Sequence, residues 1–134
     1  MARRTILIAD DEPYLTFMLA TRLRDTGAEV VVAADGEEAF RLAKEHLPNL
    51  ILTDFQMPVM SGLDLARRLL ELPSTAEIPV VLLTARGHRL PAAELAVTNI
   101  RHLVAKPFST KELIAVVNEI CGVDQIEGVR SKAA

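Results

Sequence analysis

Cysteine is almost absent from this chain, because Cys121 is the only one among 134 residues. A single thiol excludes an intramolecular disulfide and any metal cluster built from several cysteines. An excess of positive charge is also lacking, since the formal net charge is -3 at pH 7. Proteins that bind the phosphate backbone of nucleic acids are normally basic. We therefore expect no direct binding to nucleic acid and no attraction to an anionic membrane surface.

Long apolar runs are missing as well. The amino terminus, MARRTILIAD, is basic, but only a short apolar run follows before three consecutive acidic residues. This pattern fits neither a signal peptide nor a membrane span, so the expected location is the cytoplasm. The sequence contains no internal repeat, low-complexity tract or interdomain linker. With 50% hydrophobic and 25% charged residues, it predicts one soluble globular domain with a single core.

Short apolar runs alternate along the chain with amphipathic segments. This alternation is typical of βα units around a parallel sheet. The predicted strands are Thr5 to Ala9, Glu29 to Ala34, Asn49 to Thr53, Ile78 to Leu83, and the shorter Arg101 to Ala105. Because these runs are almost continuously apolar, we expect helices to cover both faces of the sheet. The predicted fold class is therefore doubly wound α/β.

Helix signals follow each predicted strand. The residues expected to start or cap helices are, in chain order, Pro13, Asp35, Ser61, Pro91 and Ser109. Those expected to end helices are Gly27, Pro48 and Gly122. Their types suit these positions, because Pro fits a first turn, Asp and Ser cap amino ends, and Gly or Pro ends a helix. The fourth helix, Ala92 to Val97, is expected to be short.

Apolar spacing predicts which side of each helix faces the core. The predicted inner faces are Leu15, Met18, Leu19 and Leu23; Ala39, Leu42 and Ala43; Leu65, Leu69 and Leu72 or Leu70; and Leu113, Val116, Val117 and Ile120. The polar segment after the last helix is expected to fray. We therefore predict one domain over residues 1–122 and a tail over residues 123–134.

Polar side chains stand at the carboxyl ends of the predicted strands, where ligands bind in doubly wound sheets. They are Asp10, Asp11 and Glu12 after the first strand, Asp54 after the third, Thr84 after the fourth and Lys106 after the fifth. Taken alone, an acid such as Asp54 is usually a turn residue that accepts backbone hydrogen bonds. Together, these residues bring acids, a hydroxyl and an amine to one edge of the sheet.

Carboxylates this close together would repel one another and raise one another's pKa. A divalent cation removes the repulsion, and Mg²⁺ suits an open site of oxygen ligands. If Asp54 is a nucleophile, its carboxylate can attack a phosphoryl group to form an acyl phosphate. The metal and Lys106 would balance the charge on the transferring oxygens. Thr84 could donate its hydroxyl to one of them.

Several short motifs follow one another along the chain at these strand ends. They are Asp10-Asp11, Asp54 followed by Met57-Pro58 and Gly62, Thr84-Ala85, and Lys106-Pro107-Phe108. In this order and spacing they resemble the receiver domain of bacterial two-component response regulators, over about residues 5 to 121. The resemblance implies a flavodoxin-like (βα)5 sandwich with a five-stranded parallel sheet in the order 2-1-3-4-5. It also implies a cis bond between Lys106 and Pro107.

The resemblance assigns roles to the strand-end residues. Asp54 would accept a phosphoryl group from a sensor histidine kinase or a histidine phosphotransfer protein. Asp11 would bind Mg²⁺ directly, Asp10 would hold it more through water, and the backbone carbonyl of Gln56 would complete the protein ligands. Lys106 and Thr84 would contact the phosphoryl group, and Pro58 and Gly62 would shape the loop. Glu12 keeps two interpretations, as a neighbour of the metal or as a solvated acid favoured by the helix dipole.

A receiver of this kind is a switch that acts on itself, without a separate metabolite as substrate. Phosphorylation would reposition Thr84 and the surface of the fourth helix, fifth strand and fifth helix. An unidentified output protein, or a second copy in a homodimer, would bind there. The family commonly has Tyr or Phe three residues before the lysine, whereas this chain has Leu103. Leu103 is expected to fill the same apolar gap without supplying a ring that moves with Thr84.

Other classes stay open at this point. A binding module without phosphorylation would not need the full set of strand-end residues, although Leu103 leaves room for it. A phosphatase of the haloacid dehalogenase type places its nucleophile on the first strand in a DxD arrangement, where this chain reads Asp10-x-Glu12. Because about a dozen residues follow the last predicted helix, we expect no effector domain here. The chain is then a single-domain regulator or the receiver part of a longer protein.

Overall fold

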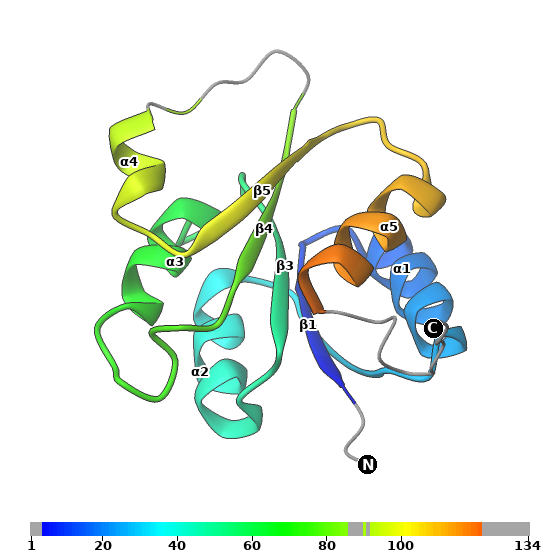
Figure 1. Cartoon of the computed structure of the whole chain (residues 1–134), viewed down its shortest axis with the longest axis horizontal. Coiled ribbons are helices and arrows are strands. Elements are labelled where there is room, and N and C mark those ends of the chain that lie inside the picture. The colour runs from blue at the N-terminus through cyan, green and yellow to red at the C-terminus, as the bar shows by residue number, and fades with distance from the viewer. Residues whose placement is uncertain (1–3, 86–89, 91, 122–134) are drawn as a thin grey trace, which may run out of the picture.

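Five parallel strands form the centre of the molecule, paired in the order β2-β1-β3-β4-β5 (Figure 1). The strands are β1 (Thr5–Ala9), β2 (Glu29–Ala33), β3 (Leu50–Asp54), β4 (Val80–Thr84) and β5 (Ile100–Ala105). The computed structural model describes residues 4–85, 90 and 92–121 of the chain. The predicted fold class and strand order are confirmed.

Two strand boundaries differ from the prediction in an instructive way. β4 begins at Val80 rather than Ile78, because the intervening Pro79 has no N–H to donate to a sheet ladder. β5 was predicted as a shorter strand over Arg101 to Ala105, but it begins at Ile100 and, with six residues, is the longest of the five strands. Its pairing starts early, since the carbonyl of Asn99 already accepts the N–H of Val80 at 3.0 Å.

Helices cover both faces of the sheet, with α1 and α5 on one side and α2 and α3 on the other (Figure 1). They are α1 (Pro13–Asp25), α2 (Gly36–His46), α3 (Gly62–Leu69), α4 (Ala92–Ala96) and α5 (Thr110–Cys121). The predicted caps at Asp35, Ser61 and Ser109 each accept a backbone N–H three residues later, at 2.8 to 3.0 Å. The predictions for Pro91, for Gly122 and for the tail over residues 123–134 lie outside the described residues.

The core consists of two layers, one on each face of the sheet. Ile6 and Ile8 belong to the cluster under α1 and α5, whereas Leu7 and Ala9 belong to the cluster under α2 and α3. This alternation follows from the two-residue period of a strand. Within the described residues, no helix is long and apolar enough to cross a membrane.

The predicted inner faces of the helices are mostly correct, but in α2 the buried residues differ from the prediction. Leu42 is only partly buried there, whereas Phe40 is a core residue. Two cations cover the Phe40 ring: Lys44 Nζ lies 4.7 Å from its centroid and the Arg68 guanidinium carbon 4.4 Å from it. Cations are attracted to the face of an aromatic ring, and these two long side chains shield it from water. The ring is therefore buried. Phe40 shares the helical spacing of Ala39 and Ala43, although the predicted inner face did not include it.

Candidate functional site

The carboxyl edge of the sheet brings together the predicted acids, hydroxyl and amine. Asp54 is the last residue of β3 and Thr84 the last of β4, while Asp10 and Lys106 directly follow β1 and β5. Asp10 is 2% exposed and Asp54 8% exposed, and Thr84 is also buried. Asp11 lies at the surface. Two carboxylates are thus held almost out of contact with water, an arrangement that needs charge compensation.

Lys106 supplies part of that compensation. Its Nζ lies 3.1 Å from Oδ1 of Asp54 and 3.7 Å from Oδ2 of Asp10. The backbone N–H of Lys106 donates to the carbonyl of Thr84 at 2.7 Å, which fixes the start of the β5–α5 loop. The bond between Lys106 and Pro107 is cis, as the sequence resemblance implied.

The charge of Lys106 is stabilised by the acids around it. Burial acts against the ammonium form, but the hydrogen bond to Asp54 and the charges of Asp10, Asp54 and Glu12 outweigh it, so the pKa of Lys106 is raised. Lys106 therefore stays protonated at neutral pH. A compact, permanently charged ammonium beside the Asp54 carboxylate suits contact with an anionic group.

Asp10 has one satisfied and one unsatisfied oxygen. Its Oδ1 accepts the backbone N–H of Glu12 at 2.9 Å, which closes the turn into α1. Its buried Oδ2 accepts no hydrogen bond from the described residues. Burial, followed by the negative charges of Asp54 and Asp11, raises the pKa of the Asp10 carboxyl above its ordinary value. A buried carboxylate oxygen without a donor is what a site for a cation presents.

The three aspartates form one cluster. One oxygen each from Asp10, Asp11 and Asp54 lies within 4.8 Å of the others. Hard carboxylate oxygens at this spacing fit a divalent cation such as Mg²⁺. Glu12 is outside this cluster. It is the exposed N-cap residue of α1. Its backbone N–H donates to Asp10, and its negative charge helps to raise the pKa of Lys106.

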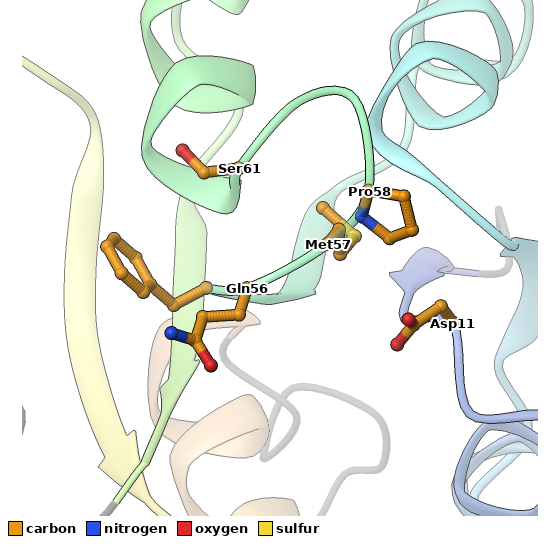
Figure 2. A pocket seen from close by; sticks show the side chains of 6 residues that line it. Asp11, Gln56, Met57, Pro58 and Ser61 are labelled. Carbon is orange, nitrogen blue, oxygen red and sulfur yellow. The ribbon is translucent and has the colours of Figure 1, made fainter.

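The β3–α3 loop forms one wall of an open cleft beside this cluster. The cleft has a volume of about 520 Å³, and Figure 2 shows Asp11 lying across it from Met57 and Pro58. Gln56 also lines it. A Cβ atom at Gly62 would overlap the carbonyl of Asp54, so only glycine allows the loop to return this close to β3. The predicted loop-shaping role of Gly62 therefore has a steric cause.

One residue of this loop was not anticipated. Val59 has φ of 73°, and the N–H of Met60 donates to the carbonyl of Pro58 at 2.7 Å across it, which makes a γ-turn. A γ-turn with φ near this value is rare and strained for an L-residue. The sequence gives no signal for this turn, because a β-branched residue argues against a positive φ.

The prediction that Leu103 fills an apolar gap is wrong, because its side chain is 36% exposed. Its register partner on β4, Leu82, is fully buried. The two differ because β5 is the edge strand, and none of the five residues of α4 beside it is buried. Leu103 therefore lies on an incompletely covered part of the sheet.

Comparisons with known proteins agree with this fold and site. Residues 6–118 match the response regulator receiver domain family. Over 112 residues the chain is 38% identical to the phosphate regulon transcriptional regulatory protein PhoB of Rhizobium meliloti, a match that covers 84% of this chain and 49% of PhoB. The chain thus spans about half the length of PhoB and of other transcriptional regulators that it matches.

Solved structures give the same result. A putative response regulator from Chloroflexus aurantiacus J-10-fl superposes with a TM-score of 0.81 and 33% identity, covering 90% of this chain and 99% of that one. The receiver domain of a sensor histidine kinase from Pseudomonas aeruginosa PAO1 superposes with a TM-score of 0.79 and 27% identity, with the same coverage. That second structure has a magnesium ion coordinated in its active site cleft.

A five-stranded parallel sheet in this order defines a flavodoxin-like α/β domain. The acids at its carboxyl edge form a cluster that could hold a metal ion. The chain belongs to the response regulator receiver domain family. It is therefore a component of two-component signalling, and its domain type is a switch rather than a metabolic enzyme.

Proposed function

We propose that this receiver accepts a phosphoryl group on Asp54 in an Mg²⁺-dependent phosphorelay. The observation that carries the proposal is the pairing of the Asp54 carboxylate with Lys106 Nζ at 3.1 Å, beside two further aspartates. A carboxylate intended only to cap a turn needs neither an ammonium partner nor two acidic neighbours. A carboxylate that receives a phosphoryl group needs positive charge on one side and a cation site on the other.

The phosphodonor would be the phosphorylated histidine of a sensor kinase or of a histidine phosphotransfer protein. An oxygen of Asp54 attacks the phosphorus atom, the P–N bond breaks, and the imidazole nitrogen leaves with the bonding electron pair. The product is an acyl phosphate on Asp54. Water later attacks the phosphorus atom, the bond between phosphorus and the Asp54 oxygen breaks, and inorganic phosphate leaves. The free carboxylate returns, so the chain ends each cycle unchanged.

Magnesium would be held by the carboxylates of Asp10, Asp11 and Asp54 and by the backbone carbonyl of Gln56. When bound, the cation offsets the negative charge that gathers on the transferring oxygens. The buried Oδ2 of Asp10 supports this assignment, since it accepts no hydrogen bond from the described residues and lies 3.7 Å from its ion-pair partner, Lys106 Nζ. Asp11, at the surface, can reach the same cation from the open side of the cleft.

Lys106 and Thr84 would act on the phosphoryl group once it is attached. Lys106 already contacts Asp54 and can transfer its hydrogen bond to a phosphoryl oxygen. Thr84 lies at the end of the neighbouring strand, one residue beyond Leu83, which is the register partner of Asp54. Its hydroxyl would donate to a second oxygen.

The surface formed by α4, β5 and α5 would carry the signal. Its partner would be an output protein or a second copy of the chain. Two observations support a surface that can change packing. α4 has five residues and none of them is buried, and Leu103 on β5 is exposed. A segment with few buried contacts can shift at a small cost in free energy.

The test is a phosphorylation measured by intact mass. Incubating the chain with Mg²⁺ and acetyl phosphate, a small-molecule phosphodonor, should add one phosphoryl group to the wild type and none to Asp54→Asn. Circular dichroism of both proteins checks that the variant is folded. A wild type that gains no mass, or a variant that gains as much as the wild type, would remove Asp54 as the acceptor.

A further inference from the structure

The left-handed turn at Val59 has no explanation in packing. Its side chain is 84% exposed, so burial of the isopropyl group does not offset the unfavourable backbone conformation. Asn and Gly adopt this conformation more easily than a β-branched residue. Strained backbone persists only where the surrounding structure over-determines it, and such places gather at functional sites.

The chain before Val59 is held in place by contacts with the sheet. The N–H of Phe55 donates to the carbonyl of Leu83 at 2.8 Å. The hydroxyl of Thr53 lies 3.9 Å from Sδ of Met57. The ring of Pro58 then restricts its own φ. Residues 55–58, including Gln56, therefore approach the acid cluster along a fixed path.

The chain after Val59 is fixed as well. Met60 is buried and packs directly on Gly36, where an added Cβ would lie 2.8 Å from the Cβ of Met60. Ser61 caps α3, and the N–H of Gly62 donates to the carbonyl of Phe55 at 2.8 Å. With both flanks held, the reversal of the chain has to take place at Val59.

We propose that the Val59 turn is a positioning device for the metal site. It holds residues 55–58 beside Asp54 and across the cleft from Asp11, so that the carbonyl of Gln56 is already in place when Mg²⁺ binds. Val59 is a positioning residue rather than a ligand, because it acts through the backbone of the loop. The inference rests on the proposed function, since it assumes that the acid cluster binds Mg²⁺.

Leu47 offers a matched control, because it is the other non-glycine residue with a positive φ in the described part of the chain. It has φ of 47° and is the C-cap of α2, where its N–H donates to the carbonyl of Ala43 at 2.9 Å. It precedes β3, whereas the acid cluster lies at the opposite end of that strand. Leu47→Gly therefore also frees a residue with a positive φ, but far from the metal site.

The experiment measures Mg²⁺ affinity by isothermal titration calorimetry on the full chain, for wild type, Val59→Gly, Val59→Asn and Leu47→Gly. Val59→Gly should weaken Mg²⁺ binding about two- to fivefold, because glycine frees the loop and the metal must then order it. Val59→Asn should keep the wild-type affinity, since Asn accepts the left-handed conformation without loosening the chain as much. Leu47→Gly should also bind Mg²⁺ like the wild type.

Each other result overturns the inference. Equal affinity of Val59→Gly and wild type would show that the turn does not position the site, and the proposed function would stand. An equal loss in Leu47→Gly would indicate a general effect of stability, and an equal loss in Val59→Asn would assign the effect to the side chain. A wild type that binds no Mg²⁺ would overturn both the metal site and the inference. Thermal unfolding of all four proteins checks that each is folded during the titration.

Discussion

The acid end of the sheet and its β5 edge are built differently. At the acid end, Asp10 and Asp54 are buried, Lys106 pairs with both, and the β3–α3 loop presses against the backbone of β3 at Gly62. At the β5 edge, Leu103 is exposed and none of the residues of α4 is buried. One region is tightly determined by its contacts, and the other is loosely covered.

The difference separates two tasks of a receiver. Phosphoryl transfer requires reacting groups held in a fixed geometry, which dense contacts provide. A response to phosphorylation requires two packings that are close in free energy, which sparse contacts allow. Under the proposed function, the first task would fall to the ends of β1 and β3 in this chain, and the second to α4 and β5. Three substitutions would sharpen or break this comparison.

The largest effect is expected for Gly62→Ala. The added methyl group would overlap the Asp54 carbonyl, a backbone atom that cannot move away easily, so we expect the free energy of unfolding to fall by about 3 kcal/mol. Urea denaturation measures this loss. Gly27→Ala is the control, because nothing lies within 4 Å of a Cβ there and only the positive φ of 96° opposes it. A Gly62→Ala variant no less stable than Gly27→Ala would mean that the loop is not pressed against β3.

A smaller effect of opposite sign is expected for Asp10→Asn in Mg²⁺-free buffer. The substitution removes a buried charge and keeps an oxygen that can accept the N–H of Glu12, so the free energy of unfolding should rise by about 1 kcal/mol at pH 7. Urea denaturation with a chelator present measures the gain. Asp64→Asn on the surface of α3 is the control and should change stability by less than about 0.5 kcal/mol.

The gain in Asp10→Asn should depend on pH. The pKa of Asp10 is raised in the folded protein above its ordinary value of 3.8. The wild type therefore loses stability as the pH rises from that value through the raised one, since the carboxyl must give up its proton in a buried place. The advantage of the variant should vanish as the pH falls toward 3.8. A gain that is the same at all pH values would contradict the assignment to this carboxyl.

The smallest effect is expected for Leu103→Ala. Its side chain already contacts water, so the loss of stability should stay below about 1 kcal/mol, whereas Leu82→Ala on the paired strand should cost about 2–5 kcal/mol. Urea denaturation of the two variants compares Leu82 on the buried strand β4 with its register partner Leu103 on the edge strand β5. Equal losses would show that the β5 edge is packed as firmly as the middle of the sheet.

The sequence predicted the acid end better than the β5 edge, for a physical reason. Asp10, Asp54 and Lys106 could be placed because strand ends follow from apolar runs, and parallel strands bring their carboxyl ends together. The exposure of Leu103 depends on how much of β5 the short α4 covers, which no local pattern encodes. Phe40, by contrast, shares the helical spacing of the buried residues Ala39 and Ala43, so its burial could have been predicted from the sequence. Lys44 and Arg68 then cover its ring.

Val59 marks a different limit. Local propensity argues against a left-handed valine, and the turn exists because the flanking residues of the loop are fixed by tertiary contacts. A backbone conformation that tertiary contacts impose against the local preference cannot be predicted from the neighbouring residues. The positive φ of Val59 follows only from the structure of the β3–α3 loop.

The central claim is that the tightly determined acid end carries the phosphoryl group on Asp54. The most direct measurement phosphorylates the chain with acetyl phosphate and Mg²⁺, reduces the product with sodium borohydride, and locates the modified residue by peptide mass spectrometry. Borohydride converts an acyl phosphate to an alcohol, so Asp54 should be read as homoserine. Homoserine at Asp10 or Asp11, or a phosphoryl group that resists borohydride on another residue type, would contradict the account.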